Sequence, residues 1–237
     1  MTVRNPDPAA SPGATATLLL LADGRFPAGG HAHSGGVEAA VAAGRVHDLP
    51  TLESFLTGRA ATTGAVAAAF CAATCARWPC DVPAMTELDT ELDARTPSAA
   101  LRAASRKLGR QLLRATRVIW PHPAWEHLMT AYPVGLHQPI MLGATAAAAA
   151  LPPPSAALLA VQEAVIGPAT AAVRLLGLDP LAVHATVARL TPVIDHLVAA
   201  ATEYAHGSPQ DLPCHSAVLL DIRAEHHTTW EVRLFAT

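Results

Sequence analysis

The chain is poor in aromatic and charged side chains, which make up only 4% and 15% of its 237 residues. Hydrophobic residues account for 51%, and much of that share is alanine. A composition rich in alanine and poor in aromatic residues favours closely packed helices over a sheet, which prefers β-branched and aromatic side chains. The length allows one large domain or two small ones, with a sizeable core. We therefore predict an all-α fold.

An excess of positive charge and a secretory signal are also missing. The net charge of −3 gives no reason to expect binding to nucleic acid. The first fourteen residues contain prolines and an aspartate but no apolar run of the kind found in signal peptides. No Cys-x-x-Cys pair occurs among Cys71, Cys75, Cys80 and Cys214. We expect buried, reduced thiols in a cytoplasmic protein.

A long membrane-spanning run is absent, although no Asp, Glu, Lys or Arg occurs from His127 to Gln162. The longest clean apolar run in this region, Ile140 to Leu151, ends in three prolines. It is shorter than the roughly twenty residues that a membrane helix needs. The run therefore predicts a buried core helix, with no membrane association.

The motifs of common enzyme classes are missing as well. The segment from Pro27 to Glu38 is rich in glycine, but it lacks the Lys-Ser/Thr ending of a nucleotide-binding loop and the Gly-x-Gly-x-x-Gly spacing of a dinucleotide site. The chain has no Gly-x-Ser-x-Gly elbow and no His-Glu-x-x-His zinc helix. We therefore predict a protein that is not an enzyme.

Metal binding remains an alternative interpretation of the same region. His31 and His33 form a His-x-His pair, and Cys71 and Cys75 stand four residues apart on one helix face. Packing and capping explain these residues better, because alanines surround both cysteines and several close histidine pairs are expected by chance. We favour the packing interpretation, and keep a nickel-binding carrier as the alternative function.

Proline and glycine divide the chain into a series of helices. We predict a single compact multi-helix domain over residues 15–206, between a disordered tail at 1–14 and a flexible C-terminal tail at 207–237. Asp48 or Thr51 is expected to cap one helix and Ser98 a second, longer one. A bend is expected at Gly167-Pro168 in the helix from Ser155 to Gly177. The last predicted helix runs from Pro180 to Ala205.

The helix that follows Ser98 carries a cationic stripe. No acidic residue occurs between Asp93 and Glu126. The stripe is either a solvated outer face, paired with the acidic residues that precede the helix, or a docking surface for an acidic partner. Its arginines are Arg102, Arg106, Arg110, Arg114 and Arg117.

Four stretches together resemble one protein family. The segment from Leu18 to Glu38 is similar to the amino-terminal signature of the UreF family of urease accessory proteins, with its Pro-x-Gly-Gly and His-Ser-x-Gly elements. The stretch from Arg102 to Arg110 resembles the central helix of that family, with its Arg-x-x-Ser-x-x-x-Gly pattern. The stretch from His137 to Gly143 and the C-terminal residues from Leu220 onward match later family segments.

The resemblance implies an all-α, dimeric maturation factor. Proteins of this family bridge a UreD/UreH-type scaffold protein and a UreG-type GTPase, and the assembly docks on apo-urease. Nickel is handled by the complex, coupled to GTP hydrolysis, and no cofactor is expected to bind this chain tightly. The family's tail is associated with the scaffold protein, which gives the candidates Asp221, His227, Arg233, Leu234 and Phe235. Further partner-binding candidates lie in the glycine loop (Pro27, Gly29, Gly30, His33, Ser34, Gly36 and Glu38) and on the cationic helix (Arg102, Arg106 and Arg110).

Overall fold

A computed structural model describes residues 12–79 and 81–236, and these residues form helices and connections without a strand. The predicted all-α fold is confirmed. The helices are α1 (Pro12–Ala22), η2 (Gly30–Ala32), α2 (Val37–Ala42), α3 (Leu49–Arg59), η3 (Ala60–Gly64), α4 (Ala65–Arg77), α5 (Val82–Ala94), α6 (Ala99–Ile119), α7 (Ala124–Ala131), α8 (Gln138–Ala148), α9 (Pro153–Leu176), α10 (Pro180–Arg189), α11 (Thr191–Glu203), η4 (Pro209–Asp211) and α12 (Val218–Thr228).

Two helices begin where the capping residues predict. The Asp48 carboxylate accepts a hydrogen bond from the Thr51 amide at 2.9 Å, and the Thr51 hydroxyl accepts one from the Asp48 amide at 3.1 Å. This reciprocal pair satisfies two amides at the start of α3. At the start of α6, the Ser98 hydroxyl accepts a hydrogen bond from the Leu101 amide at 3.1 Å.

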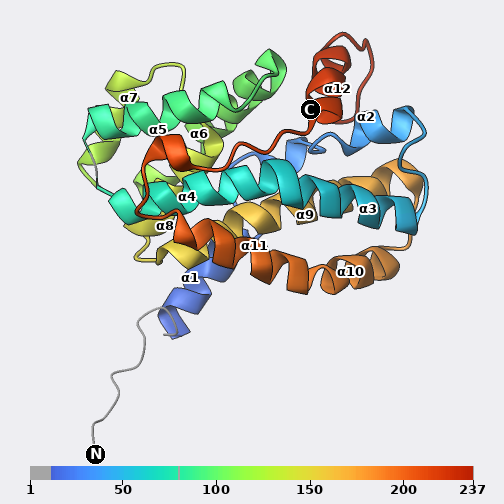
Figure 1. Ribbon diagram of the computed structural model, residues 1–237, viewed down its shortest axis with the longest axis horizontal. Helices are drawn as coiled ribbons and strands as arrows, with labels where there is room; N and C mark the ends of the chain where they lie inside the picture. The colour runs from blue at the N-terminus through green and yellow to red at the C-terminus, as the bar shows by residue number, and fades with distance from the viewer. Residues whose placement is uncertain (1–11, 80, 237) are drawn as a thin grey trace, which may run out of the picture.

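The core surrounds one long helical element. Helices α3 and α4 continue into each other through the π-helix η3 and cross the molecule from side to side, with α9 and α11 alongside (Figure 1). Helix α9 is long and apolar enough to cross a membrane by length and composition, but 61% of its most apolar window is buried inside the fold. Its apolar character is accounted for by packing against α4, α8 and α11.

Small residues allow these helices to approach closely. A Cβ atom added to Gly109 on α6 would lie 2.1 Å from the Leu136 carbonyl oxygen. One added to Gly143 on α8 would lie 2.3 Å from the carbonyl oxygen of Cys71 on α4. Helix α6 therefore packs almost backbone to backbone against the connection that precedes α8, and α8 packs in the same way against α4, as the alanine-rich composition predicts.

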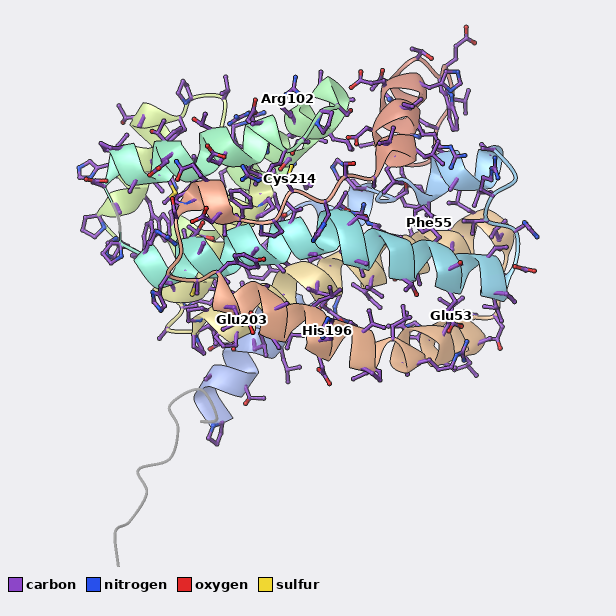
Figure 2. The ribbon with its side chains drawn as sticks, viewed as in Figure 1. Glu53, Phe55, Arg102, His196, Glu203 and Cys214 are labelled. Atoms are coloured by element: carbon purple, nitrogen blue, oxygen red, sulfur yellow. The ribbon has the colours of Figure 1, made fainter. Side chains whose placement is uncertain are left out.

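The cysteines are divided between the core and the surface. Cys71 and Cys75 are buried free thiols, as predicted, and burial raises the pKa of Cys71 and raises that of Cys75 to about 12. The expectation is wrong for Cys214, which is exposed on the segment that crosses between α4 and α6 (Figure 2). Cys80 lies outside the described residues.

Three helix boundaries differ from the predictions. Helix α1 begins at Pro12 rather than Thr15, and the remainder of the predicted N-terminal tail, residues 1–11, lies outside the described residues. The predicted helix from Pro180 to Ala205 is split into α10 and α11, because Pro192 in the first turn of α11 cannot donate an amide hydrogen bond to the preceding turn. Helix α7 lies in a proline-rich stretch for which the sequence pattern predicts no helix, and the buried indole of Trp125 anchors it.

The C-terminal region contains the helices η4 and α12 and is hydrogen-bonded to the helical domain. Arg95 donates hydrogen bonds to the carbonyl oxygens of Gln210 at 2.9 Å and Leu212 at 3.2 Å. Arg77 donates one to the carbonyl oxygen of Ala205 at 2.8 Å. These two arginines fasten the connection that leads to α12, which stands next to α2 at the upper right of Figure 1. Patterns along the sequence do not predict these contacts, because the partners lie at least 115 residues apart.

Candidate functional site

The centre of the candidate site is the carboxylate of Glu38, which is buried on α2. Its Oε2 accepts a hydrogen bond from Nε2 of His227 at 2.9 Å and one from the Phe235 amide at 3.2 Å. Its Oε1 accepts one from the Leu234 amide at 2.7 Å. One carboxylate therefore holds three donors of the C-terminal segment against the helix that follows the glycine loop.

The glycine loop is shaped to receive this segment. Gly36 adopts a φ of +90°, and a Cβ atom there would lie 2.9 Å from Cδ2 of Leu220 on α12. The Ala236 amide donates a hydrogen bond to the Ala32 carbonyl oxygen at 2.8 Å, and the Phe235 ring is buried. Glycine is needed at position 36 both for the left-handed backbone and for the close approach of α12.

His227 and Ser34 complete the buried centre. His227 is buried beside the Trp230 ring, with 4.6 Å between ring centroids. Its Nδ1 is sealed from solvent and has no hydrogen-bond partner among the described residues. The Ser34 hydroxyl, also buried, accepts a hydrogen bond from the Glu38 amide at 3.4 Å. The structure thus brings Ser34, Gly36, Glu38, His227, Leu234 and Phe235 together.

The remaining loop and tail candidates lie around this centre. Gly29 adopts a φ of +82° and faces Gln111 of α6, and burial lowers the pKa of His33. Asp221 on α12 is partly buried, and burial raises its pKa. The other candidates, Pro27, Gly30 and Arg233, are exposed.

A contact that the sequence did not single out fixes α12 on α6. Oε1 of Glu225 accepts a hydrogen bond from the Ser98 hydroxyl at 2.5 Å and another from the Ala100 amide at 2.9 Å. Ser98 is therefore both the cap of α6 and a docking point for α12. The first role is readable from sequence, whereas the second depends on a residue 127 positions away.

The cationic helix divides into two parts. Arg106 is paired inside the protein, at 2.8 Å from Asp89 and 2.7 Å from Asp93, and Arg102 approaches Asp93 at 3.6 Å. These pairs favour the internal alternative for both residues, because their charges are taken up by α5. The exposed charges of the stripe are Lys107, Arg110, Arg114 and Arg117.

The pairs of Arg106 continue into a polar network at the start of α8. His137 is buried, with Nδ1 at 3.0 Å from the Ser105 hydroxyl and Nε2 at 3.0 Å from Asp93. Burial lowers the pKa of His137, against the effect of its acidic neighbours. Burial acts to raise the pKa of Asp93, but hydrogen bonds from Arg106 and His137 bring it below its ordinary value. The stretches around Arg102 and His137 thus belong to one polar network that connects α5, α6 and the start of α8.

Comparison with known proteins identifies the family. The sequence model of the UreF family matches residues 46–191. The urease accessory protein UreF of Mycobacterium sp. (strain JLS) is 45% identical over 221 residues, which cover 93% of this chain and 98% of the relative. The chain belongs to the UreF family. Its general role is therefore in urease maturation, and the relatives are named as accessory proteins rather than as enzymes.

Further UreF proteins cover the chain to a similar extent. That of Mycolicibacterium vanbaalenii is 44% identical over 222 residues, covering 94% of this chain and 98% of the relative. That of Mycobacterium tuberculosis (strain ATCC 25618 / H37Rv) is 40% identical over 212 residues, with 90% and 93% covered. These alignments extend over nearly the whole length of each relative, so the similarity to UreF proteins is not confined to residues 46–191.

The candidate metal ligands are not brought together in the part of the chain that the structure describes. Cys71 and Cys75 lie in the interior of α4, whereas His31 lies exposed at the surface loop. Within residues 12–79 and 81–236, no group of three or more His, Cys, Asp or Glu side chains is arranged to hold a metal ion.

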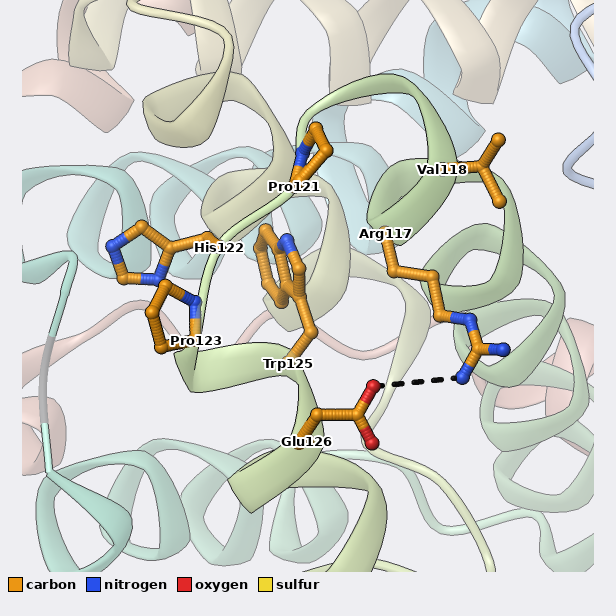
Figure 3. A pocket seen from close by; sticks show the side chains of 7 residues that line it. All are labelled: Arg117, Val118, Pro121, His122, Pro123, Trp125 and Glu126. Carbon is orange, nitrogen blue, oxygen red and sulfur yellow. Dashed lines mark ion pairs between the residues drawn. The ribbon is translucent and has the colours of Figure 1, made fainter.

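A surface pocket of about 510 Å³ lies where α6 ends and α7 begins. Figure 3 shows Arg117 directed toward Glu126 across this pocket, with 3.8 Å between the charged atoms. The exposed side chain of Val118 lies beside them (Figure 3). The pocket lies at the far end of α6 from the Ser98 cap and α12, so it is separate from the Glu38 centre.

Proposed function

We propose that this chain is an adaptor of urease maturation, which joins a UreD/UreH-type scaffold protein to a UreG-type GTPase so that nickel reaches apo-urease with GTP hydrolysis. The observation that carries the proposal is the contact of Glu38 with the C-terminal segment. Through it, the glycine loop and the segment from α12 onward form one continuous part of the surface. Partner-binding residues from both ends of the chain can therefore act together.

Exposed apolar side chains give this part of the surface the character of a docking site. They stand on the outer side of α12 and on the irregular segment that follows it, whereas the Glu38 centre beneath them is buried. Clustered exposed apolar residues on a folded protein mark interaction sites. We call this set the tail surface: Val218, Leu219, Ile222, Val232 and Leu234.

We assign the tail surface to the scaffold protein and the glycine-loop side to the GTPase or to a second copy of the chain. The exposed charges of α6, such as Arg110 and Arg114, are available to steer an acidic partner. In this proposal the chain works as a homodimer in the cytoplasm, and nickel is handled by the assembled complex.

Co-purification with the scaffold protein tests the assignment of the tail surface. Ile222→Asp and Leu234→Asp place a charge on exposed positions without removing any buried group, so the fold should persist. Each is expected to reduce capture of the scaffold protein at least tenfold. Leu181→Asp, at an exposed leucine on α10, is the matched control and should bind normally. Full capture by both tail variants would refute the assignment.

The steering role of α6 has a separate test. Arg110→Glu and Arg114→Glu reverse exposed charges and leave the internal pairs of Arg106 intact. Both should slow association with the acidic partner, and added salt should slow the wild-type protein in the same way. If neither the substitutions nor added salt changes the association rate, these arginines have no steering role and form only a solvated outer face of α6.

Titration calorimetry with nickel separates the adaptor from the carrier alternative. An adaptor takes up nickel at most weakly, and the double variant His31→Ala/His33→Ala should behave like the wild type. Tight uptake by the purified wild-type chain, lost in the double variant, would support the carrier instead.

A further inference from the structure

A cavity of about 460 Å³ lies beneath the glycine loop. It is bordered by the loop, the continuous helix α3–η3–α4, α6, α9 and the C-terminal segment. Much of its wall is apolar, with Leu21, Phe26, Val66, Leu108, Leu112 and Leu142 among the lining residues. Small-molecule sites typically have about 300–1,000 Å³ and this kind of apolar lining, with a few polar groups.

One of those polar groups is the guanidinium of Arg59, at the end of α3. Its Nε donates a hydrogen bond to the Ala164 carbonyl oxygen at 3.1 Å, and its Nη1 donates one to the Thr63 hydroxyl at 3.4 Å. Among the described residues no carboxylate lies within 4.0 Å of it. Burial lowers the pKa of Arg59 to about 10, so the group stays charged at neutral pH. A charge enclosed by protein is normally matched by an opposite charge.

Glu163, an acidic residue of the same wall, only partly neutralises the positive charge of Arg59. Glu163 on α9 accepts a hydrogen bond from the amide of Gln138. Burial raises the pKa of Glu163 to about 7, so its carboxyl group is about half protonated at neutral pH. Three arginine and three acidic side chains line the cavity as a whole: Arg59, Arg95 and Arg174, and Asp23, Glu163 and Asp221. The positive charge of Arg59 therefore stands at the cavity wall without a directly paired carboxylate among the described residues, and the carboxyl group of Glu163, when protonated, can donate a hydrogen bond.

The backbone next to Arg59 departs from regular α-helical geometry at two places. The π-helix Ala60–Gly64 starts at the next residue, and π turns inside α-helices occur frequently at functional sites. Gly35, with a φ of +61°, closes over Arg59: a Cβ atom there would lie 3.2 Å from the guanidinium carbon. The absence of a side chain at Gly35 therefore leaves room for the Arg59 guanidinium at the cavity wall.

We propose that this cavity binds a small organic carboxylate with an apolar body. The carboxylate pairs with the guanidinium of Arg59, whose planar fork fits two oxygens, and the apolar body lies against the leucine-rich wall. The amide of Gln138 and the protonated form of Glu163 supply further donors. This inference concerns the interior of the protein and does not depend on the adaptor proposal, which concerns its outer surface.

A ligand series on the wild-type chain tests the proposal without any substitution. Octanoate, 1-octanol and octylammonium share one apolar body and differ in the charge of the head group. By titration calorimetry at pH 7, octanoate should bind at least tenfold more tightly than 1-octanol, and octylammonium more weakly than either. Equal binding of octanoate and 1-octanol, tighter binding of octylammonium, or no binding of octanoate would each overturn it.

Substitution at Arg59 then assigns the head-group contact. Arg59→Met should reduce octanoate affinity to that of 1-octanol while the affinity for 1-octanol changes less than twofold, which also shows that the cavity is still formed. Arg189→Met, at an exposed arginine outside the cavity, is the matched control and should leave both affinities unchanged. Retention of octanoate affinity in Arg59→Met would overturn the proposal. If that variant does not fold, the ligand series decides.

Discussion

The carboxylate of Glu38 offers the sharpest test of how the C-terminal segment is held. Glu38→Ala removes the acceptor of three hydrogen bonds, from His227, Leu234 and Phe235. A hydrogen bond to a charged group contributes about 1.5–3 kcal/mol, so three would sum to about 4.5–9 kcal/mol if they were independent. They are not, because the released amides of Leu234 and Phe235 can bond water. Leaving the buried Nε2 donor of His227 without its acceptor costs about 1–3 kcal/mol, and we take the upper end.

A loss of about 3 kcal/mol corresponds to roughly a 150-fold larger population of the released segment, since each 1.4 kcal/mol is a factor of ten. Native-state hydrogen exchange measures this population directly. The exchange rates of the Leu234 and Phe235 amides should rise about 100-fold in Glu38→Ala. Amides in the core of α4 should change far less, because the segment opens without unfolding the helical domain.

Glu231→Ala is the matched control for this experiment. Glu231 is exposed on the same segment, and the variant removes the same charge without removing an acceptor from the Glu38 centre. Its exchange rates should match those of the wild type. A rise of less than tenfold in Glu38→Ala, or an equal rise in the control, would refute the reasoning that hydrogen bonds to Glu38 hold the segment.

Three further predictions concern the interior. Gly109→Ala should lower the free energy of unfolding by about 2–4 kcal/mol, measured by urea denaturation, because the new Cβ would overlap a carbonyl oxygen. The control Gly58→Ala, in open space on α3, should raise it by about 0.5–1 kcal/mol. Cys71 should resist iodoacetamide in the native protein while Cys214 reacts, as read by mass spectrometry of the peptides; equal labelling would contradict the buried position of α4. Carboxyl NMR should give Glu163 a pKa of about 7. Since this pKa is raised from 4.5, its stabilising contribution should be complete below pH 4.5 and lost as the pH rises through 7; a value near 4.5 would contradict the desolvation of this carboxyl group at the cavity wall.

Features that depend on neighbouring residues could be predicted from the sequence. The caps at Asp48 and Ser98 are of this kind, because the acceptor and the amide that it serves are three residues apart. The buried thiols of Cys71 and Cys75 follow from the alanines that surround them. In contrast, the break before Pro192 was missed because the apolar spacing continues through it, although proline in a first turn signals a new helix.

The same distinction applies to the cationic stripe of α6. Its spacing placed all five arginines on one helix, and only the packing of α5 against it shows that Arg106 is neutralised by Asp89 and Asp93. The sequence indicates that acidic residues before the helix can pair with these arginines, but it does not decide between such internal pairs and binding to an acidic partner protein. Asp89 and Asp93 lie seventeen and thirteen positions before Arg106, well beyond one helical turn.

The glycine loop and the C-terminal segment show why a site can be recognised in parts and still not be foreseen as a whole. Each was singled out separately, the loop for its glycines and the tail for its resemblance to the family. Nearly 200 positions separate Glu38 from Leu234 and Phe235, so no periodicity links them. Yet Gly36 has no side chain at the point where Leu220 of α12 approaches, and this open space is useful only if α12 is present. The loop therefore acts as the seat of the C-terminal segment, and the surface available to partners is set by both ends of the chain at once.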